Sequence, residues 1–426
     1  MTDLSDIRIC IIGLGYVGLP LARLFSERFP VVGFDRNPDR IDELKAGKDH
    51  TGELTETELQ TAIERGNLSF STLTEEIKEC NFYIVAVPTP VDRNNHPDLT
   101  PLIGASETVG RVISPGDTVV YESTVYPGVT EEECIPVIEK TSGMSYNRDF
   151  FAGYSPERIN PGDKNHRVET IMKVTSGSTP ESAVLIDNVY RSVLYNGTFR
   201  ASSIRVAEAS KIIENAQRDV NIAFMNELAK IFNAMGIDTA EVIEAASSKW
   251  NFIKLKPGLV GGHCISVDPY YLIEKAQVYG VMPRIMQAAR HLNDGMGSYV
   301  AERVVDLMNR RGILVKGADI LIAGFTFKEN CPDMRNTKVA DIISSLKRYT
   351  DSITIVDPHA DPATAKRQYG IDIFDTFPGN TLYDVVIHAV AHARYADFDF
   401  RSLLKPGGVV YDVKSTLSVG QADERL

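Results

Sequence analysis

The chain has 426 residues, of which 43% are hydrophobic and 24% charged, so it is globular in composition and too long for one typical core. Its formal charge of -12 argues against nucleic acid or an anionic membrane surface as a general partner, and no apolar run reaches the length of a membrane span. Five scattered cysteines without metal-ligand or CxxC spacing predict neither a disulfide framework nor a metal site, so we expect a cytoplasmic protein.

The first expected element is a short apolar strand over 8–12, followed directly by Gly13-Leu14-Gly15-Tyr16-Val17-Gly18. An amphipathic helix over 19–29 comes next, and a second strand over 31–34 ends on Asp35. Strand, glycine turn, helix, strand and acid at this spacing are typical of a unit that binds a dinucleotide. The alternative is a glycine-rich turn in an unrelated α/β protein.

Each part of this unit has a physical task. Gly13 permits a tight turn, Gly15 lets the backbone approach a pyrophosphate, and Gly18 lets the helix pack on the strand. Asp35 can accept from both hydroxyls of a ribose, which favours NAD over NADP, whereas Arg36 is of the type that holds a 2′-phosphate. The candidate cofactor contacts here are Gly13, Gly15, Tyr16, Val17, Gly18, Asp35 and Arg40.

The pattern continues with buried strands expected over 82–87 and 118–121, which end near Thr89 and Thr124. Cofactors lie across the carboxyl ends of such strands, so both threonines are candidate contacts, and capping of the strand ends is an equally good interpretation. A further strand over 151–153 leads to Ser155-Pro156-Glu157-Arg158, which places Glu157 at the same edge.

A long helix is predicted over 203–235, with Lys211, Asn215 and Arg218 on one polar face, and a second over 283–311. The opening plan then returns without the glycine signature, as strands over 318–324, 352–356, 384–389 and 408–413 with a helix over 336–349. We therefore expect an α/β fold with two Rossmann-like doubly wound domains bridged by long central helices, and a cleft between the domains. The expected boundaries are 1–202 for the N-terminal domain, 203–311 for the central helical region and 312–426 for the C-terminal domain.

The segment 258–271 reads Gly-Leu-Val-Gly-Gly-His-Cys-Ile-Ser-Val-Asp-Pro-Tyr-Tyr. A lone cysteine is usually a small buried hydrophobic residue. A cysteine beside two glycines, in a chain that binds NAD, has another use, because it can add to an aldehyde and hold it covalently while a second hydride leaves. Cys264 is therefore a candidate nucleophile.

Four motifs, in chain order, resemble the UDP-glucose/GDP-mannose dehydrogenase family over nearly the whole chain. They are the turn from Gly13 to Pro20, Glu208-Ala209-Ser210-Lys211 with Asn215, the loop from Gly261 to Asp268, and Phe327-Lys328-Glu329-Asn330 with Arg335. The cysteine loop resembles the branch that acts on UDP-N-acetylhexosamines, because Ile265-Ser266-Val267-Asp268 stands where UDP-glucose members usually carry Phe-Pro-Lys-Asp or Leu-Pro-Lys-Asp. The segment 155–162 also fits that branch better.

The resemblance implies two oxidations by NAD at C6 of the sugar, through a thiohemiacetal and a thioester on Cys264, and release of the uronic acid by water. It implies that Lys211 stabilises the alkoxide with Asn215 in support, that Asp268 orients a water and keeps Lys211 charged, and that Glu157 is the base of hydrolysis. The implied catalytic set is Cys264, Lys211, Asp268, Asn215, Glu157 and Thr124. The implied substrate contacts are Glu157, Arg158, Lys211, Asn215, Lys256, Gly261 and Lys328, with Arg335 a contact to NAD.

Each of these residues also has a purely structural interpretation. Lys211 would then be an exposed helix lysine, Asp268 and Glu157 would form caps or ion pairs, and Lys256 would lie on a solvated face. For the whole chain, the alternatives are a UDP-glucose 6-dehydrogenase, a hydroxyacid dehydrogenase with a single oxidation, and an NAD-binding protein without catalysis. The apolar stripes of the central helices exceed what two domains would cover and indicate a homodimer or higher oligomer. A uronic acid for a surface polysaccharide is a natural product.

Overall fold

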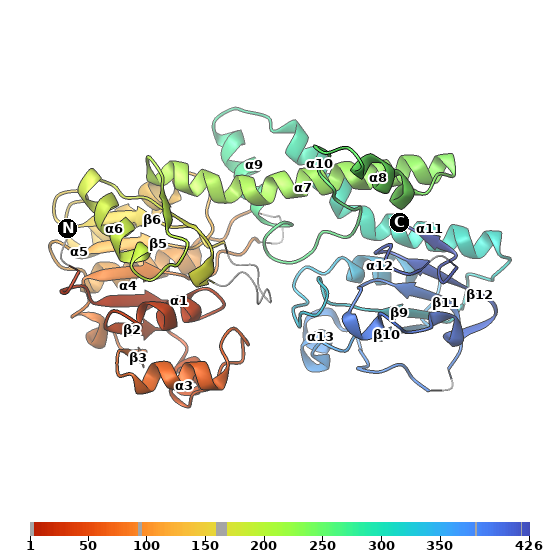
Figure 1. Ribbon diagram of the computed structural model, residues 1–426, viewed down its shortest axis with the longest axis horizontal. Helices are drawn as coiled ribbons and strands as arrows, with labels where there is room; N and C mark the ends of the chain where they lie inside the picture. The colour runs from red at the N-terminus through yellow and green to blue at the C-terminus, as the bar shows by residue number, and fades with distance from the viewer. Residues whose placement is uncertain (1–3, 93–95, 159–167, 380, 419) are drawn as a thin grey trace. The chain divides into compact units, whose positions relative to one another are not determined.

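The computed structural model describes residues 4–92, 96–158, 168–379, 381–418 and 420–426 (Figure 1). The chain forms two compact units, one from Met1–Glu214 with Tyr270–Gly280 and the other from Asn215–Pro269 with Val281–Leu426. Among the described residues, no helix combines the length and the apolar character needed to cross a membrane.

Within the described residues, the first unit holds a six-stranded sheet in the order β3-β2-β1-β4-β5-β6, with every neighbouring pair parallel. The strands are β1 (Ile9–Ile12), β2 (Val31–Phe34), β3 (Leu68–Ser71), β4 (Phe82–Val85), β5 (Thr118–Tyr121) and β6 (Phe151–Tyr154). This is the strand order of a dinucleotide-binding doubly wound sheet, in which ligands lie across the carboxyl ends of the strands.

Helices cover both faces of this sheet, and the strand residues alternate between them. Ile9 and Ile11 of β1 belong to one buried cluster with residues of α1 and α6, whereas Cys10 and Ile12 belong to another with residues of α4 and α5. A strand buried on both faces needs apolar residues at every position, which explains the continuous apolar run of β1. The helices are α1 (Gly18–Phe25), α2 (Pro38–Lys45), α3 (Glu56–Glu64), α4 (Thr100–Val112), α5 (Ile135–Ser142) and α6 (Pro180–Arg191).

The first unit also holds a small parallel pair, β7 (Lys173–Thr175) and β8 (Thr198–Arg200), and α7 (Ile204–Met235) follows it. Helix α7 is continuous from the residues of the first unit into those of the second. The remaining helices are α8 (Thr239–Ser247), α9 (Asp268–Val278), α10 (Arg284–Asp294), α11 (Met296–Arg310), α12 (Val339–Leu346) and α13 (Pro362–Tyr369).

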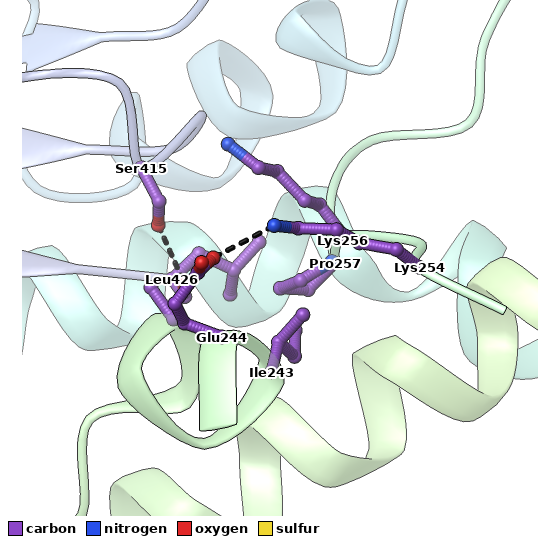
Figure 2. Close-up of a pocket in the computed structure, with 8 residues that line it drawn as sticks. Ile243, Glu244, Lys254, Lys256, Pro257, Ser415 and Leu426 are labelled. Carbon is purple, nitrogen blue, oxygen red and sulfur yellow. Dashed lines mark hydrogen bonds and ion pairs between the residues drawn. The ribbon is translucent and has the colours of Figure 1, made fainter. Parts of the chain in front are cut away.

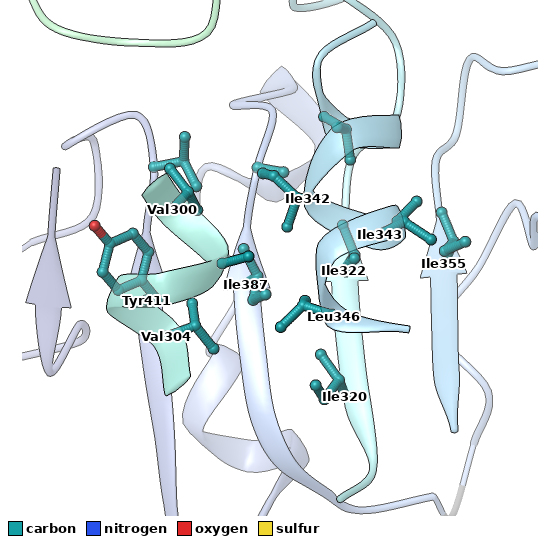
Figure 3. Packing of buried hydrophobic residues seen from close by; sticks show 14 of the residues in the cluster. Val300, Val304, Ile320, Ile322, Ile342, Ile343, Leu346, Ile355, Ile387 and Tyr411 are labelled. Carbon is teal, nitrogen blue, oxygen red and sulfur yellow. The ribbon is translucent and has the colours of Figure 1, made fainter. Parts of the chain in front are cut away.

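In the second unit, a five-stranded parallel sheet has the order β10-β9-β11-β12-β13 over the described residues. Its strands are β9 (Ile320–Ala323), β10 (Ile353–Val356), β11 (Tyr383–His388), β12 (Leu404–Asp412) and β13 (Glu424–Arg425). Figure 3 shows Val300 and Val304 of α11 and Leu346 of α12 against one face of this sheet, with Ile320 and Ile322 beneath them. Residues Leu321 and Ala323 face the opposite cluster, so this sheet too is buried on both sides.

The predicted α/β class with two Rossmann-like sheets is confirmed, and the helix predicted over 203–235 is α7. The single helix predicted over 283–311 is wrong, because Gly295 separates α10 from α11. Glycine is the poorest helix former after proline, and a periodic apolar pattern does not register an interruption of one residue. The three domain boundaries remain a proposal.

Candidate dinucleotide site and cysteine loop

The glycine turn after β1 leaves no room for side chains at two of its positions. Gly13 has φ +93°, and a Cβ there would lie 2.8 Å from the carbonyl oxygen of Ala86. A Cβ on Gly18 would lie 1.8 Å from the carbonyl oxygen of Gly13. Beside Gly15, in contrast, nothing lies within 4 Å of the Cβ position, so a ligand can reach the backbone there. The turn fits the pyrophosphate of a dinucleotide.

Asp35 lies directly after β2 and is held by backbone amides. Its Oδ2 accepts from Leu14 N at 3.0 Å, and its Oδ1 accepts from Asn37 N at 2.9 Å. A carboxylate has about four lone-pair positions, so acceptor capacity remains for ribose hydroxyls. The glycine turn and the Asp35 carboxylate together fit the pyrophosphate and a ribose of NAD.

Arg40 supports the same turn from inside the protein. Its side chain is 5% exposed, and Nε donates to the carbonyl oxygen of Leu14 at 2.9 Å. Its remaining nitrogens donate to Asp49 at 2.8 Å and to Glu43 at 3.0 Å. The guanidinium is thus occupied by protein groups, and direct contact of Arg40 with a cofactor stays a prediction.

Thr89 and Thr124 follow β4 and β5, and the structure brings them together. The Oγ1 of Thr89 donates to the carbonyl oxygen of Thr124 at 2.7 Å, so this hydroxyl ties the two loops to one another. This bond is what a strand-end cap would make. Thr124 itself is half-buried at the carboxyl edge of the sheet. A role of either threonine toward a ligand stays a prediction.

Glu157 and Arg158 lie in the loop after β6. Glu157 is 7% exposed, and its Oε1 accepts from Arg158 N at 2.5 Å. The Arg158 side chain donates through Nε to Glu214 of α7 at 2.9 Å and through Nη1 to the carbonyl oxygen of Met172 at 3.0 Å. Arg158 thus fastens this loop to α7. The rest of the segment that suggested the branch, from Ile159 to Gly162, lies outside the described residues.

A buried ionic group beside Glu157 was not predicted from the sequence. Lys173 of β7 donates through Nζ to Glu122 Oε2 at 2.5 Å, and Tyr190 of α6 donates to Glu122 Oε1 at 2.6 Å. Burial, against the opposing attraction of Lys173 and with a smaller contribution from the negative charge of Glu157, raises the pKa of Glu122 to about 7. The only local signal was Glu122 directly after an apolar strand, since nothing marks Lys173 as buried.

Lys211 lies on α7 and is 8% exposed, so it is not the exposed helix lysine of the structural alternative. In the described part of its own unit, no hydrogen bond or ion pair engages its ammonium group. Three residues earlier, Glu208 accepts from Gly128 N at 2.6 Å and Thr130 N at 3.0 Å, which anchors α7 to the loop after β5. Burial raises the pKa of Glu208 to about 7, although these amides oppose the shift.

The two glycines before Cys264 are packed tightly in the second unit. A Cβ on Gly261 would lie 2.8 Å from the carbonyl oxygen of Asn336, and one on Gly262 would lie 2.8 Å from the ring of Phe327. The carbonyl oxygen of Gly262 accepts from Asn336 Nδ2 at 2.9 Å and from Ser266 Oγ at 2.6 Å. The loop is therefore held in place by its neighbours, and Cys264 on it is half-buried.

Asp268 is the first residue of α9 and is 3% exposed. Its amide donates to the carbonyl oxygen of Cys264 at 2.8 Å, which closes the cysteine loop. Its carboxylate accepts from Asn215 Nδ2 at 2.5 Å. Two predicted catalytic residues that are far apart in the sequence are thus joined directly.

Lys328 and Arg335 lie in the loop after β9. The carbonyl oxygen of Lys328 accepts from Thr326 Oγ1 at 3.0 Å, and Arg335 pairs with Asp333 at 2.6 Å. The backbone carbonyl of Arg335 accepts from Gly262 N at 3.1 Å, which connects this loop to the cysteine loop.

The same loop rests on a buried histidine and aspartate. His392 accepts through Nδ1 from Asn330 N at 3.0 Å, so its other nitrogen carries the proton toward Asp357 Oδ2, 3.0 Å away. Asp357 follows β10, and it also accepts from the amides of Phe325, Thr326, His359 and Ala360 at 2.6–3.0 Å. These bonds fix the backbone that carries Lys328.

Lys256 lines a small cavity of about 150 Å³ in the second unit (Figure 2). Its neighbour Lys254 pairs with Glu244 at 2.7 Å, and Ser415 Oγ donates to the carbonyl oxygen of Leu426 at 2.8 Å. Lys256 itself is exposed. The structure therefore places Lys256 beside a hollow surface, and its contact with a substrate stays a prediction.

The chain matches three domains of the UDP-glucose/GDP-mannose dehydrogenase family: the NAD binding domain over residues 7–194, the central domain over 205–295 and the UDP binding domain over 321–419. It is 54% identical to the UDP-N-acetyl-D-glucosamine 6-dehydrogenase of Pseudomonas aeruginosa, over 99% of this chain and 100% of the relative. The protein of the same name from Salmonella typhi is also 54% identical, with all of both chains covered. The solved structure of the UDP-D-ManNAc dehydrogenase of Pyrococcus horikoshii superposes with a TM-score of 0.88 at 27% identity, covering 98% of each chain.

Proposed function

Because the chain belongs to the UDP-glucose/GDP-mannose dehydrogenase family and is an NAD-dependent nucleotide-sugar dehydrogenase, we propose that it oxidises C6 of UDP-N-acetyl-D-glucosamine to a carboxylate. The observation that carries the proposal is the tightly packed Gly-Gly-His-Cys loop, which presents Cys264 half-buried and is closed by Asp268, whose carboxylate accepts from Asn215. UDP-N-acetylgalactosamine is the first alternative substrate, and UDP-glucose is the second.

When bound, NAD⁺ would supply the hydride acceptor for each of the two oxidations at C6. The turn at Gly13, Gly15 and Gly18 would hold its pyrophosphate, and Asp35 would accept from its adenosine ribose. Tyr16, Val17, Thr89 and Arg335 are further proposed contacts, and Arg40 acts by bracing the turn.

Cys264 supplies the covalent step of the proposed mechanism. Its thiolate adds to the C6 aldehyde, and the resulting thiohemiacetal becomes a thioester when C6 is oxidised a second time. Lys211 donates to the C6 oxygen while negative charge develops there, which is most effective for a buried ammonium. Asn215 is proposed to contact the same oxygen. Thr124, at the carboxyl edge of the sheet, is the further residue of the proposed catalytic set.

Two carboxylates complete the proposed mechanism. Asp268 accepts from Asn215, which orients the amide, and it also orients a water. Glu157 takes the proton of the water that releases the acid from Cys264. Arg158, Lys256, Gly261 and Lys328 are the proposed contacts to the remainder of the nucleotide sugar.

The assembly and the setting are part of the same proposal. The described surface of the second unit exposes large apolar side chains, among them Trp250 at 92% and Ile285 at 73%, which supports a homodimer. The five cysteines are free thiols, which supports a cytoplasmic protein, and the net charge of -12 gives no general attraction for nucleic acid. We propose the three domain boundaries given above and a role in surface polysaccharide synthesis.

The test is the yield of NADH at 340 nm with purified protein and limiting sugar nucleotide. Two NADH per UDP-N-acetylglucosamine are expected, with less turnover of the galacto, manno and glucose nucleotides. One NADH per sugar would indicate the single-oxidation alternative, and none from any of the four would indicate a protein without this activity. Cys264→Ser serves as the matched control, since near-normal NADH production by it would refute the covalent step.

A further inference from the structure

The buried group of Glu122, Lys173 and Tyr190 takes no part in the steps above, yet it lies against the loop that carries Glu157. The side chains of Lys173 and Glu122 are both 0% exposed. A buried ammonium is costly unless it is paired and hydrogen-bonded, so the position of this lysine requires its partners.

Lys173 contacts the Glu157 loop at two points. Its Nζ donates to the carbonyl oxygen of Pro156, the residue before Glu157, at 3.3 Å. The same nitrogen lies 3.8 Å from Glu157 Oε2, an ion-pair distance. One ammonium group therefore contacts both the backbone next to Glu157 and the Glu157 carboxylate itself.

The other side of the loop is held independently. Arg158 donates to the carbonyl oxygen of Met172, the residue before Lys173, and to Glu214 of α7. The start of β7 thus secures the loop through two consecutive residues: Met172, directly before the strand, by its backbone, and Lys173, its first residue, by its side chain. This arrangement fixes the direction in which the Glu157 carboxylate points.

We propose that Lys173 is a positioning residue for Glu157 in thioester hydrolysis, with Glu122 and Tyr190 holding its ammonium in place. The inference rests on the proposed function. In that step the oxygen of a water attacks the thioester carbon, and the proton of the water passes to the Glu157 carboxylate. The C–S bond then breaks, and its electron pair leaves on Cys264 as thiolate, so no oxidant or reductant is consumed.

The test uses Lys173→Met with UDP-N-acetylglucosamine and NAD⁺. The variant is expected to release two NADH per active site in a burst and then to turn over at least about tenfold more slowly, because general-base catalysis has weakened. Denaturing mass spectrometry of the quenched enzyme is expected to show the sugar nucleotide attached to Cys264. Lys173→Arg, which keeps the charge, is expected to recover part of the rate. Hydrolysis at the wild-type rate in Lys173→Met would overturn the proposal.

A second pair of variants separates positioning from simple charge balance. In Lys173→Met/Glu122→Gln, the buried carboxylate that lost its partner becomes neutral, which also protects the fold if the single variant is unstable. The double variant is expected to accumulate the same adduct. A return to wild-type hydrolysis would mean that Lys173 only neutralises Glu122, and would refute its action on Glu157. Lys140→Met, at an exposed position of α5, is the matched control and is expected to accumulate none.

Glu157→Gln distinguishes this inference from the proposed function. If Glu157→Gln accumulates the adduct and Lys173→Met does not, the inference fails and the role of Glu157 stands. If neither variant accumulates it while both still produce two NADH, the base role of Glu157 fails as well.

Discussion

At the scale of single residues, Asp357 shows how one carboxylate organises a loop. Burial alone would raise the pKa of Asp357, but the hydrogen bond from His392 and those from the amides of Phe325 and Thr326 outweigh it and hold the pKa well below its ordinary value. A folded-state pKa below the unfolded value means that ionisation stabilises the fold. That contribution is present above the unfolded pKa of about 4 and is lost as the pH falls toward the folded value.

We predict that Asp357→Asn lowers the free energy of unfolding by about 2–4 kcal/mol at pH 7, because the amide no longer accepts from every donor around it. The difference from the wild type is expected to shrink as the pH falls below about 4. Urea unfolding at several pH values measures it. Asp351→Asn, at an exposed position, is the control and is expected to match the wild type throughout. An equal loss for Asp357→Asn at every pH would contradict the electrostatic account.

At the scale of elements, a chain of buried polar groups joins α7, α10 and the segment before the cysteine loop. Arg290 of α10 donates to Asp219 of α7 at 2.6 Å, and Asn293 donates to the same carboxylate at 2.7 Å. Asn226 of α7 donates to Asn293 at 2.8 Å and accepts from Gly258 N at 2.8 Å. The orientation of the two helices thus sets where the cysteine loop begins.

We predict that Arg290→Met destabilises the second unit by about 3–5 kcal/mol, since it leaves the Asp219 carboxylate buried without its cation. Arg290→Met/Asp219→Leu removes both charges and is expected to recover most of that stability. Thermal and urea unfolding of the two variants measure the difference. A double variant no more stable than Arg290→Met would show that packing, rather than the charge, decides stability here.

Local patterns predicted much of this fold and less of the site. The glycine turn and the place of Asp35 after β2 are encoded within one strand–helix–strand unit, so spacing alone predicted where they lie, while their contacts with NAD stay a prediction. The bond between Asn215 and Asp268 joins positions 53 residues apart, and that between Glu122 and Lys173 joins positions 51 apart. No periodicity reports such pairs, and a lysine at the start of a strand is ordinarily expected in solvent.

At the scale of the whole molecule, the described surface exposes several large apolar side chains in and beside the central helices. In the second unit, Trp250, Ile253, Val281, Met282 and Ile285 are between 58% and 92% exposed. Monomeric proteins seldom expose large apolar patches, and five large apolar side chains in one unit are many, which is why we propose that a second copy covers them.

We predict that light scattering after gel filtration gives twice the chain mass, and that Trp250→Glu or Ile285→Glu shifts the mass toward the monomer. An apolar contact is little affected by salt, so the dimer is expected to persist at 0.5 M NaCl, about three times physiological ionic strength. Leu314→Glu, equally exposed in the loop before β9, is the control and is expected to remain dimeric. A monomeric wild type at micromolar concentration would contradict the prediction.

The two aspartates that follow the second strands of the two sheets differ in how many of their lone pairs are already occupied. Within the described residues, Asp35 accepts two amides and keeps half of its acceptor positions, whereas Asp357 accepts four amides and a histidine and keeps none. The same strand–helix–strand plan therefore ends once in a carboxylate with acceptor positions to spare, which we propose for a ribose, and once in a carboxylate fully engaged by its own loops. Because the second plan also lacks the glycine turn, its sheet offers neither of the two features with which we propose that the first sheet binds NAD.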